Sequence, residues 1–96
     1  MKYISTRGGV APKSFEDVIL TGLAPDGGLF VPDQLPQFSH SEISSWKDLS
    51  YQELALKVMS PFVDGAIPQV ELKRLIEKSY ASFRHSEIAP LVKTGK

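Results

Sequence analysis

The residues of this sequence best suited to chemistry are an arginine and two glycine pairs. Arg7 stands directly before Gly8 and Gly9, and a second pair, Gly27 and Gly28, follows an aspartate. A guanidinium is a planar fork of N–H donors that suits phosphate or carboxylate, and glycines let backbone N–H groups approach a bound anion. The alternative is that both pairs only turn the backbone, since glycine readily adopts a positive φ. Both interpretations stay open, and both place the pairs in turns.

Other site chemistries find little support in the sequence. Neither glycine pair fits the G-x-G-x-x-G dinucleotide pattern or the P-loop. The chain has no cysteine, which excludes disulfides, thiolate metal sites and cysteine nucleophiles. Its two histidines, His40 and His85, have no second ligand at metal spacing, and no serine stands in a nucleophile elbow. We therefore expect neither a metal site nor a catalytic residue within these positions.

The composition is ordinary for a soluble protein. Eleven Lys and Arg balance eleven Asp and Glu, which argues against a nucleic-acid binder, because such domains usually carry a basic excess. The longest apolar runs contain only three residues, whereas a membrane-spanning helix needs about 20. The first residues lack the apolar core of a signal peptide. We expect a cytoplasmic protein with no nucleic-acid partner and no membrane partner.

Capping and periodicity signals predict the elements that position the two turns. The stretch Tyr3–Thr6 is β-branched and aromatic, which indicates a short strand that the first glycine pair stops. Ser14 and Asp17 stand at capping spacing, which indicates a helix that begins after Ser14. The apolar face of this helix would consist of Phe15, Val18, Ile19, Gly22 and Leu23. The second glycine pair then turns the chain into a strand at Leu29–Val31, which Pro32 ends.

The second half of the sequence predicts two longer helices. Residues 32–46 are rich in Pro, Ser, Asp and Gln and should form a surface loop with one helical turn. Ser50 and Glu53 repeat the capping signal, and Asp64–Gly65 ends the helix that follows. Its apolar face would consist of Tyr51, Leu54, Ala55, Val58, Met59 and Phe62. Pro68 suits the first turn of the next helix, whose stripe would be Leu72, Leu75, Ile76, Ser79, Tyr80 and Phe83.

These elements predict the α+β class: a small domain of about three helices with a short two- or three-stranded sheet. Ninety-six residues are enough for one domain, so we expect a single domain over residues 1–96 in which each helix buries one face. The last stretch, 88–96, closes no element. Much of the core should come from the aromatic side chains Phe15, Phe30, Phe62, Tyr80 and Phe83.

Four stretches of the sequence carry a family resemblance: Met1–Gly8, Phe15–Leu23, Gly22–Pro32 and, as a weaker match, Ile88–Leu91. They resemble bacterial and fungal threonine synthases. The phrase Asp-Gly-Gly-Leu-Phe-Val-Pro, downstream of Ser-Thr-Arg-Gly, is specific when both occur together. The resemblance covers essentially the whole sequence, but only the N-terminal domain of the family.

The resemblance implies a pyridoxal-phosphate (PLP) enzyme of fold type II that converts O-phospho-L-homoserine and water to L-threonine and phosphate, with the PLP ring as electron sink. In the family, the lysine that holds PLP lies in a His-Gly-Pro-Thr-x-x-Phe-Lys-Asp motif, which does not occur here. The cofactor-binding domains would follow residue 96. We therefore expect this segment to bind no PLP and to be inactive alone. Its partner would be the remainder of its own polypeptide.

The resemblance also implies a place for this segment in the enzyme. It should pack on the larger PLP-binding domains and help to cover the active-site cleft. O-Phosphohomoserine carries a phosphate and a carboxylate, which arginine and glycine N–H groups suit. The residues expected nearest to the substrate are Ser5, Thr6, Arg7, Asp26, Gly27 and Gly28. An alternative of another class is a stand-alone interaction module without enzymatic activity.

Overall fold

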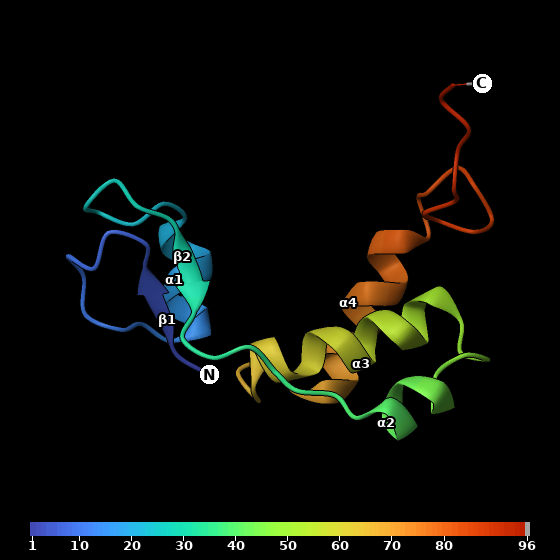
Figure 1. The fold of residues 1–96 in the computed structure, drawn as a ribbon, viewed down its shortest axis with the longest axis horizontal. Coiled ribbons are helices and arrows are strands. Elements are labelled where there is room, and N and C mark those ends of the chain that lie inside the picture. The colour runs from blue at the N-terminus through green and yellow to red at the C-terminus, as the bar shows by residue number, and fades with distance from the viewer. Residues whose placement is uncertain (96) are drawn as a thin grey trace.

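The chain folds into two lobes. The computed structural model describes residues 1–95, so Lys96, the end of the stretch 88–96, lies outside the described residues. The elements are β1 (Tyr3–Ser5), α1 (Phe15–Thr21), β2 (Phe30–Pro32), α2 (His40–Ser45), α3 (Tyr51–Val63) and α4 (Gln69–Tyr80). Figure 1 shows β1, α1 and β2 in one lobe and helices α2 to α4 in the other. The prediction of a small α+β domain is confirmed, with a two-stranded antiparallel sheet.

Serine side chains cap the starts of three helices. Ser14 accepts a hydrogen bond from the Asp17 backbone N–H at 3.3 Å, which confirms the start predicted for α1. Ser50 and Glu53 exchange side-chain and backbone hydrogen bonds at the start of α3, as predicted. Each cap satisfies a backbone donor that the first turn of a helix leaves without a partner. The boundaries of α1 and α3 therefore follow from local sequence.

Helix α2 is longer than the single turn expected within residues 32–46. It has six residues and begins with a second reciprocal cap, formed by Ser39 and Glu42. The signal was present in the sequence, since a serine followed three residues later by glutamate is the same pattern that predicts α3. The abundance of Pro, Ser and Gln around it favoured a loop and concealed the helix.

The sheet consists of β1 and β2 in a register that pairs Tyr3 with Pro32. Strand β2 thus begins and ends one residue later than the predicted Leu29–Val31. The Tyr3 N–H donates to the Lys13 carbonyl at 2.9 Å, and the Lys13 N–H donates back to the Tyr3 carbonyl at 2.9 Å. Both main-chain groups of Tyr3 are therefore satisfied by Lys13, and Pro32, which has no N–H, breaks no bond to Tyr3.

The turn between α3 and α4 follows the prediction closely. Asp64 and Gly65 both adopt left-handed conformations, with φ of 50° and 80°, which aspartate tolerates and glycine adopts freely. Pro68 precedes α4 as its N-cap residue instead of lying in the first turn. Helix α4 ends at Tyr80, so Phe83 lies beyond it.

The core lies between α3 and α4, and it is mainly aliphatic. Its buried members are Val63, Leu72 and Ile76, against which Phe15 and Tyr80 pack as half-buried side chains. The prediction of a core built largely from aromatic residues is therefore wrong in part. Phe30 and Phe62 are only half-buried, and Phe83 is 50% exposed because α4 ends before it.

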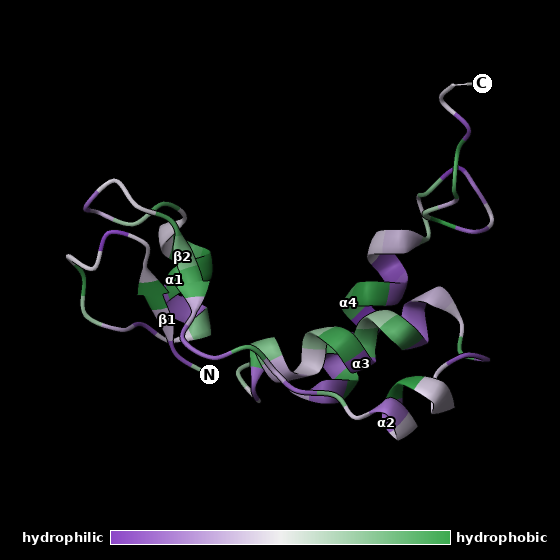
Figure 2. Ribbon diagram, viewed as in Figure 1, coloured by the Kyte–Doolittle hydropathy of each residue, from purple (hydrophilic) through white to green (hydrophobic). Residues whose placement is uncertain are grey.

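The apolar stripe of α1 stays largely uncovered. Ile19 and Leu23 are 64% and 70% exposed, and the neighbouring Leu20 is 87% exposed. The expectation that each helix buries one face is thus wrong for α1 within residues 1–95. Figure 2 shows the hydrophobic colouring on α1 as well as on α3 and α4. None of the helices in this part of the chain has the length and apolar character needed to cross a membrane.

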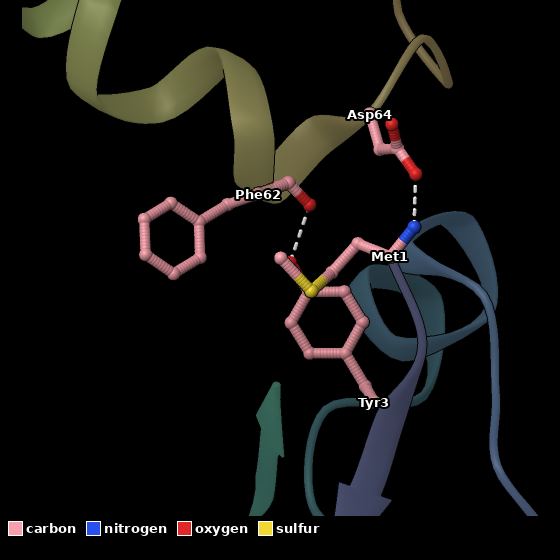
Figure 3. A network of polar contacts seen from close by, with 4 residues as sticks. All are labelled: Met1, Tyr3, Phe62 and Asp64. Carbon is pink, nitrogen blue, oxygen red and sulfur yellow. Dashed lines mark hydrogen bonds and ion pairs between the residues drawn. The ribbon is translucent and has the colours of Figure 1, made fainter. Parts of the chain in front are cut away.

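Two polar contacts join the lobes at the start of the chain (Figure 3). The Tyr3 hydroxyl donates to the backbone carbonyl of Phe62, and the Met1 ammonium group forms an ion pair with the Asp64 carboxylate. Burial and, second to it, the negative charge of Asp64 raise the pKa of Tyr3, so its hydroxyl keeps the proton that it donates. The first strand is thereby fixed to the end of α3.

The aliphatic core predicts a clear stability difference along α4. Ile76→Ala should lower the free energy of unfolding by about 2–5 kcal/mol, because it removes buried methyl groups and leaves a cavity. Val70→Ala on the same helix should change it by less than about 0.5 kcal/mol, because Val70 is 79% exposed. Urea denaturation followed by circular dichroism measures both. Equal losses in the two variants would contradict the placement of the core.

Candidate functional site

The two glycine turns lie against each other at the end of the sheet. The Thr6 N–H donates to the Leu29 carbonyl at 2.8 Å, and the Leu29 N–H donates to the Thr6 hydroxyl at 2.9 Å. These bonds continue the pairing of β1 with β2 and hold residues 6–9 beside residues 24–28. The six residues predicted near the substrate therefore form one cluster, which we call the turn cluster: Ser5, Thr6, Arg7, Asp26, Gly27 and Gly28.

The carboxylate of Asp26 is the centre of the turn cluster. It accepts hydrogen bonds from the Ser5 hydroxyl at 2.8 Å and from the N–H groups of Gly9 and Gly28 at 2.9 Å each. The bond from Gly28 and then that from Ser5 are the main causes that lower the pKa of Asp26, and Gly9 and the charge of Arg7 add to them. Together these contributions outweigh desolvation, which alone would raise the pKa of Asp26. The carboxylate is therefore ionised at neutral pH.

Gly28 is required because neighbouring atoms leave no room for a side chain, and Gly27 is required by its backbone conformation. A Cβ on Gly28 would lie 2.5 Å from the Ser5 hydroxyl oxygen and 2.9 Å from that of Thr6. A Cβ on Gly27 would lie 2.6 Å from a guanidinium nitrogen of Arg7, and Gly27 also has a φ of +86°. The second glycine pair therefore serves both close approach and turn geometry.

The glycine N–H groups of both turns already have acceptors within the chain. Those of Gly8 and Gly27 donate to backbone carbonyls at 3.0 Å each, while those of Gly9 and Gly28 donate to Asp26. The anion that these turns hold is thus a side chain of the protein itself. A role of the glycine N–H groups towards a substrate anion stays a prediction, and this geometry does not favour it.

Arg7 is the residue of the turn cluster with unused capacity for an anion. One nitrogen, Nη1, donates to the Asp26 backbone carbonyl at 3.1 Å, and the side chain is exposed. A guanidinium carries five N–H donors in a fixed fork, so most of its donors are not used by the hydrogen bond to Asp26. The turn cluster therefore presents an oriented cation that can form paired hydrogen bonds with a phosphate or carboxylate.

Two members of this arrangement were missed by sequence reasoning. Gly9 donates to Asp26, and Leu29 exchanges hydrogen bonds with Thr6 through its backbone. The signal for Gly9 was its place in the first glycine pair, for which an anion had been considered but not the Asp26 side chain as that anion. No signal marks Leu29, because its contribution comes from main-chain atoms that every residue has.

The histidines lie apart from the turn cluster. His40 begins α2, and Nδ1 of His85 accepts the Glu87 backbone N–H at 3.0 Å. In the part of the chain that the structure describes, no three His, Asp or Glu side chains gather closely enough to hold a metal ion. A hollow of about 450 Å³ between the lobes is lined by Met1 and Asp64 among others, and it includes none of the turn cluster.

Comparison with known proteins gives the family. A family described as "Threonine synthase N terminus" matches residues 2–80. The chain belongs to the threonine synthase family. It is 53% identical over 91 residues to a threonine synthase of Pseudomonas aeruginosa, in an alignment that covers 95% of this chain and 19% of that relative. The chain thus spans about a fifth of the length of the curated threonine synthases that it matches.

Solved threonine synthases share the fold of this chain. The crystal structure of PLP-bound threonine synthase from Brucella melitensis superposes with a TM-score of 0.91 at 44% identity, over 99% of this chain and 20% of that chain. The yeast enzyme superposes with a TM-score of 0.85 at 41% identity, over 93% of this chain and 18% of that chain. The recognition of a threonine synthase N-terminal region from sequence is therefore confirmed.

The hydrogen bonds of the Asp26 carboxylate predict a pH dependence of stability. The pKa of Asp26 is lower in the folded than in the unfolded state, so its ionised form stabilises the fold above the unfolded pKa. This stabilisation is lost as the pH falls through the folded pKa.

Asp26→Asn places an amide N–H donor next to the backbone N–H groups that the carboxylate now accepts. It should therefore lower the thermal midpoint at pH 7 and reduce the loss of stability below about pH 4. Thermal melts across this pH range test it, and Asp48→Asn, at an exposed aspartate, should follow the wild-type curve. Parallel curves for Asp26→Asn and wild type would contradict the role of the carboxylate.

The lack of space at Gly28 predicts a steric effect. Gly28→Ala should lower the free energy of unfolding by about 1–3 kcal/mol, because the new methyl group displaces the Ser5 and Thr6 hydroxyls. Gly95→Ala is the matched control, since its Cβ would meet no atom within 4 Å. Urea denaturation compares the two. A Gly28→Ala midpoint equal to that of the control would show that the turns separate easily.

Proposed function

We propose that this chain is the N-terminal domain of a cytoplasmic threonine synthase, the PLP-dependent enzyme that converts O-phospho-L-homoserine and water to L-threonine and phosphate. The observation that carries the proposal is the match of 99% of the chain to PLP-bound threonine synthase, with a TM-score of 0.91 and 44% identity. Because the matched region is about a fifth of that chain, the activity would belong to the complete polypeptide.

The described residues do not fit the role of PLP holder. The lysine that forms a Schiff base with PLP is typically desolvated by its pocket, whereas every described lysine here is exposed: Lys2, Lys13, Lys47, Lys57, Lys73, Lys78 and Lys93. The N–H groups of both glycine pairs, which are the type of donor that binds a phosphate, are bonded within the chain. In this proposal the remainder of the polypeptide holds PLP, and this domain is non-catalytic alone.

The turn cluster supports a role at the edge of the active-site cleft. In this proposal the domain packs on the PLP-binding part, and the two turns help to cover the cleft. Arg7 would bind the phosphate or carboxylate of the substrate with the N–H groups that it does not donate to Asp26. Asp26, Ser5 and Gly28 would fix the turns from which Arg7 projects.

Arg7 provides the test of this role. In the full-length enzyme, Arg7→Ala should raise the KM for O-phosphohomoserine about 10- to 100-fold, which corresponds to the loss of a charge-assisted hydrogen bond of about 1.5–3 kcal/mol. Arg7→Lys keeps the charge but not the fork, so its KM should lie between those of the wild type and of Arg7→Ala. Phosphate release measures these values, and Arg84→Ala, at another exposed arginine, should leave KM unchanged.

Three outcomes would contradict parts of the proposal. An unchanged KM with a lowered thermal midpoint in Arg7→Ala would assign Arg7 to structure only. Phosphate release by the 96-residue chain alone would show that the domain is itself catalytic. A natural reading frame that stops directly after Lys96 would favour the stand-alone interaction module over a threonine synthase.

A further inference from the structure

Helices α3 and α4 carry a continuous apolar face that no other part of the described chain covers completely. Two hollows of about 240 and 280 Å³ open on these helices, and they share Met59 and Tyr80. We call this face the hairpin groove. The residues that define it here are Leu54, Val58, Met59, Leu75, Tyr80 and, from α1, Phe15.

The lining of the hairpin groove contains no charged side chain. The charged residues of α4, such as Lys73, Arg74 and Lys78, are absent from it. Leu54, Val58, Met59 and Leu75 are between 36% and 44% exposed, so the hairpin buries one side of each and leaves the other side open. The exposure of these apolar side chains to water is unfavourable, so this face favours a partner that covers it.

Packing contacts form both ends of the hairpin groove, so the face is preformed. At one end, Val63, Leu72 and Ile76 form the core beneath it. At the other end, the rings of Tyr51 and Tyr80 meet edge to face, with centroids 5.1 Å apart. Because α3 and α4 are already formed, a partner that buries this face does not have to order them. The conformational cost of binding is therefore small on the side of this domain.

The length of the matching enzymes indicates what occupies the hairpin groove. The same fold unit makes up 20% of the chain of PLP-bound threonine synthase from Brucella melitensis, so four-fifths of such a polypeptide is available as a covalently attached partner. A tethered partner binds at a high effective concentration and in a fixed ratio. We propose that apolar side chains of the polypeptide that follows residue 96 in the full-length protein dock in the hairpin groove. This inference rests on the proposed function, because it requires the longer chain.

Cysteine labelling of the full-length protein tests this docking. Residues 1–96 contain no cysteine, so a cysteine introduced here can be followed without ambiguity in its own peptide by mass spectrometry. Leu75→Cys lies in the hairpin groove, and Val70→Cys lies on the same helix outside it. Under native conditions, a maleimide should label Leu75→Cys at least about tenfold more slowly than Val70→Cys, because docking must open before the thiol reacts. In urea, the two cysteines should be labelled at the same rate.

Each result of this experiment decides the proposal. Equal native labelling rates at the two positions would overturn it. A second copy of the chain would be the occupant if the protection of Leu75→Cys weakens on dilution and light scattering shows a dimer. That result would also overturn the proposal. Protection in a monomer supports it. Because labelling requires no turnover, an inactive enzyme with a protected Leu75→Cys would contradict the proposed function without contradicting the docking.

Discussion

Contact between α3 and α4 through Val63, Leu72 and Ile76 holds the helical lobe together, and the rest of the chain is arranged around this small aliphatic core. Among the described residues, no large side chain falls below 2% exposure, so the chain never encloses a residue completely. A chain of this size buries only a little over 60% of the surface that its unfolded form exposes. The open groove and the stripe of α1 are parts of the apolar surface that residues 1–95 leave exposed.

Polar contacts hold together the parts of the chain that the small core does not reach. The Asp26 carboxylate binds donors from both glycine turns, and the Tyr3 hydroxyl joins the sheet to the end of α3. An anion bound inside the turns has a further effect on the site, because it leaves the guanidinium of Arg7 as their outward-facing donor group. The geometry of this surface therefore favours the presentation of a cation over the anion-binding role that the two glycine pairs also suggested.

Much of the fold could be predicted because the signals are local. The caps at Ser14 and Ser50 lie within three residues of their partners, so they fix the starts of α1 and α3 from sequence alone. The shift of β2 could not be predicted in the same way, because Lys13 satisfies Tyr3 from the opposite edge of the strand. The periodicity of the sequence identified which residues form the apolar face of α1. It contains no information about whether another part of the protein covers that face. Residue chemistry indicated Arg7 and the glycine pairs, and the family resemblance completed the set of residues in the turn cluster. The central role of Asp26 depends on bonds across 17 and 21 residues that sequence spacing does not reveal.

The hydrogen bond from Tyr3 to the Phe62 carbonyl spans 59 positions of the chain, and this separation has a consequence for synthesis on the ribosome. At about 5–20 residues per second, the partner of the third residue is made roughly 3–12 seconds after it. During this interval the first strand has no partner on the second lobe. The contact that joins the two lobes therefore cannot form until the end of α3 has been made.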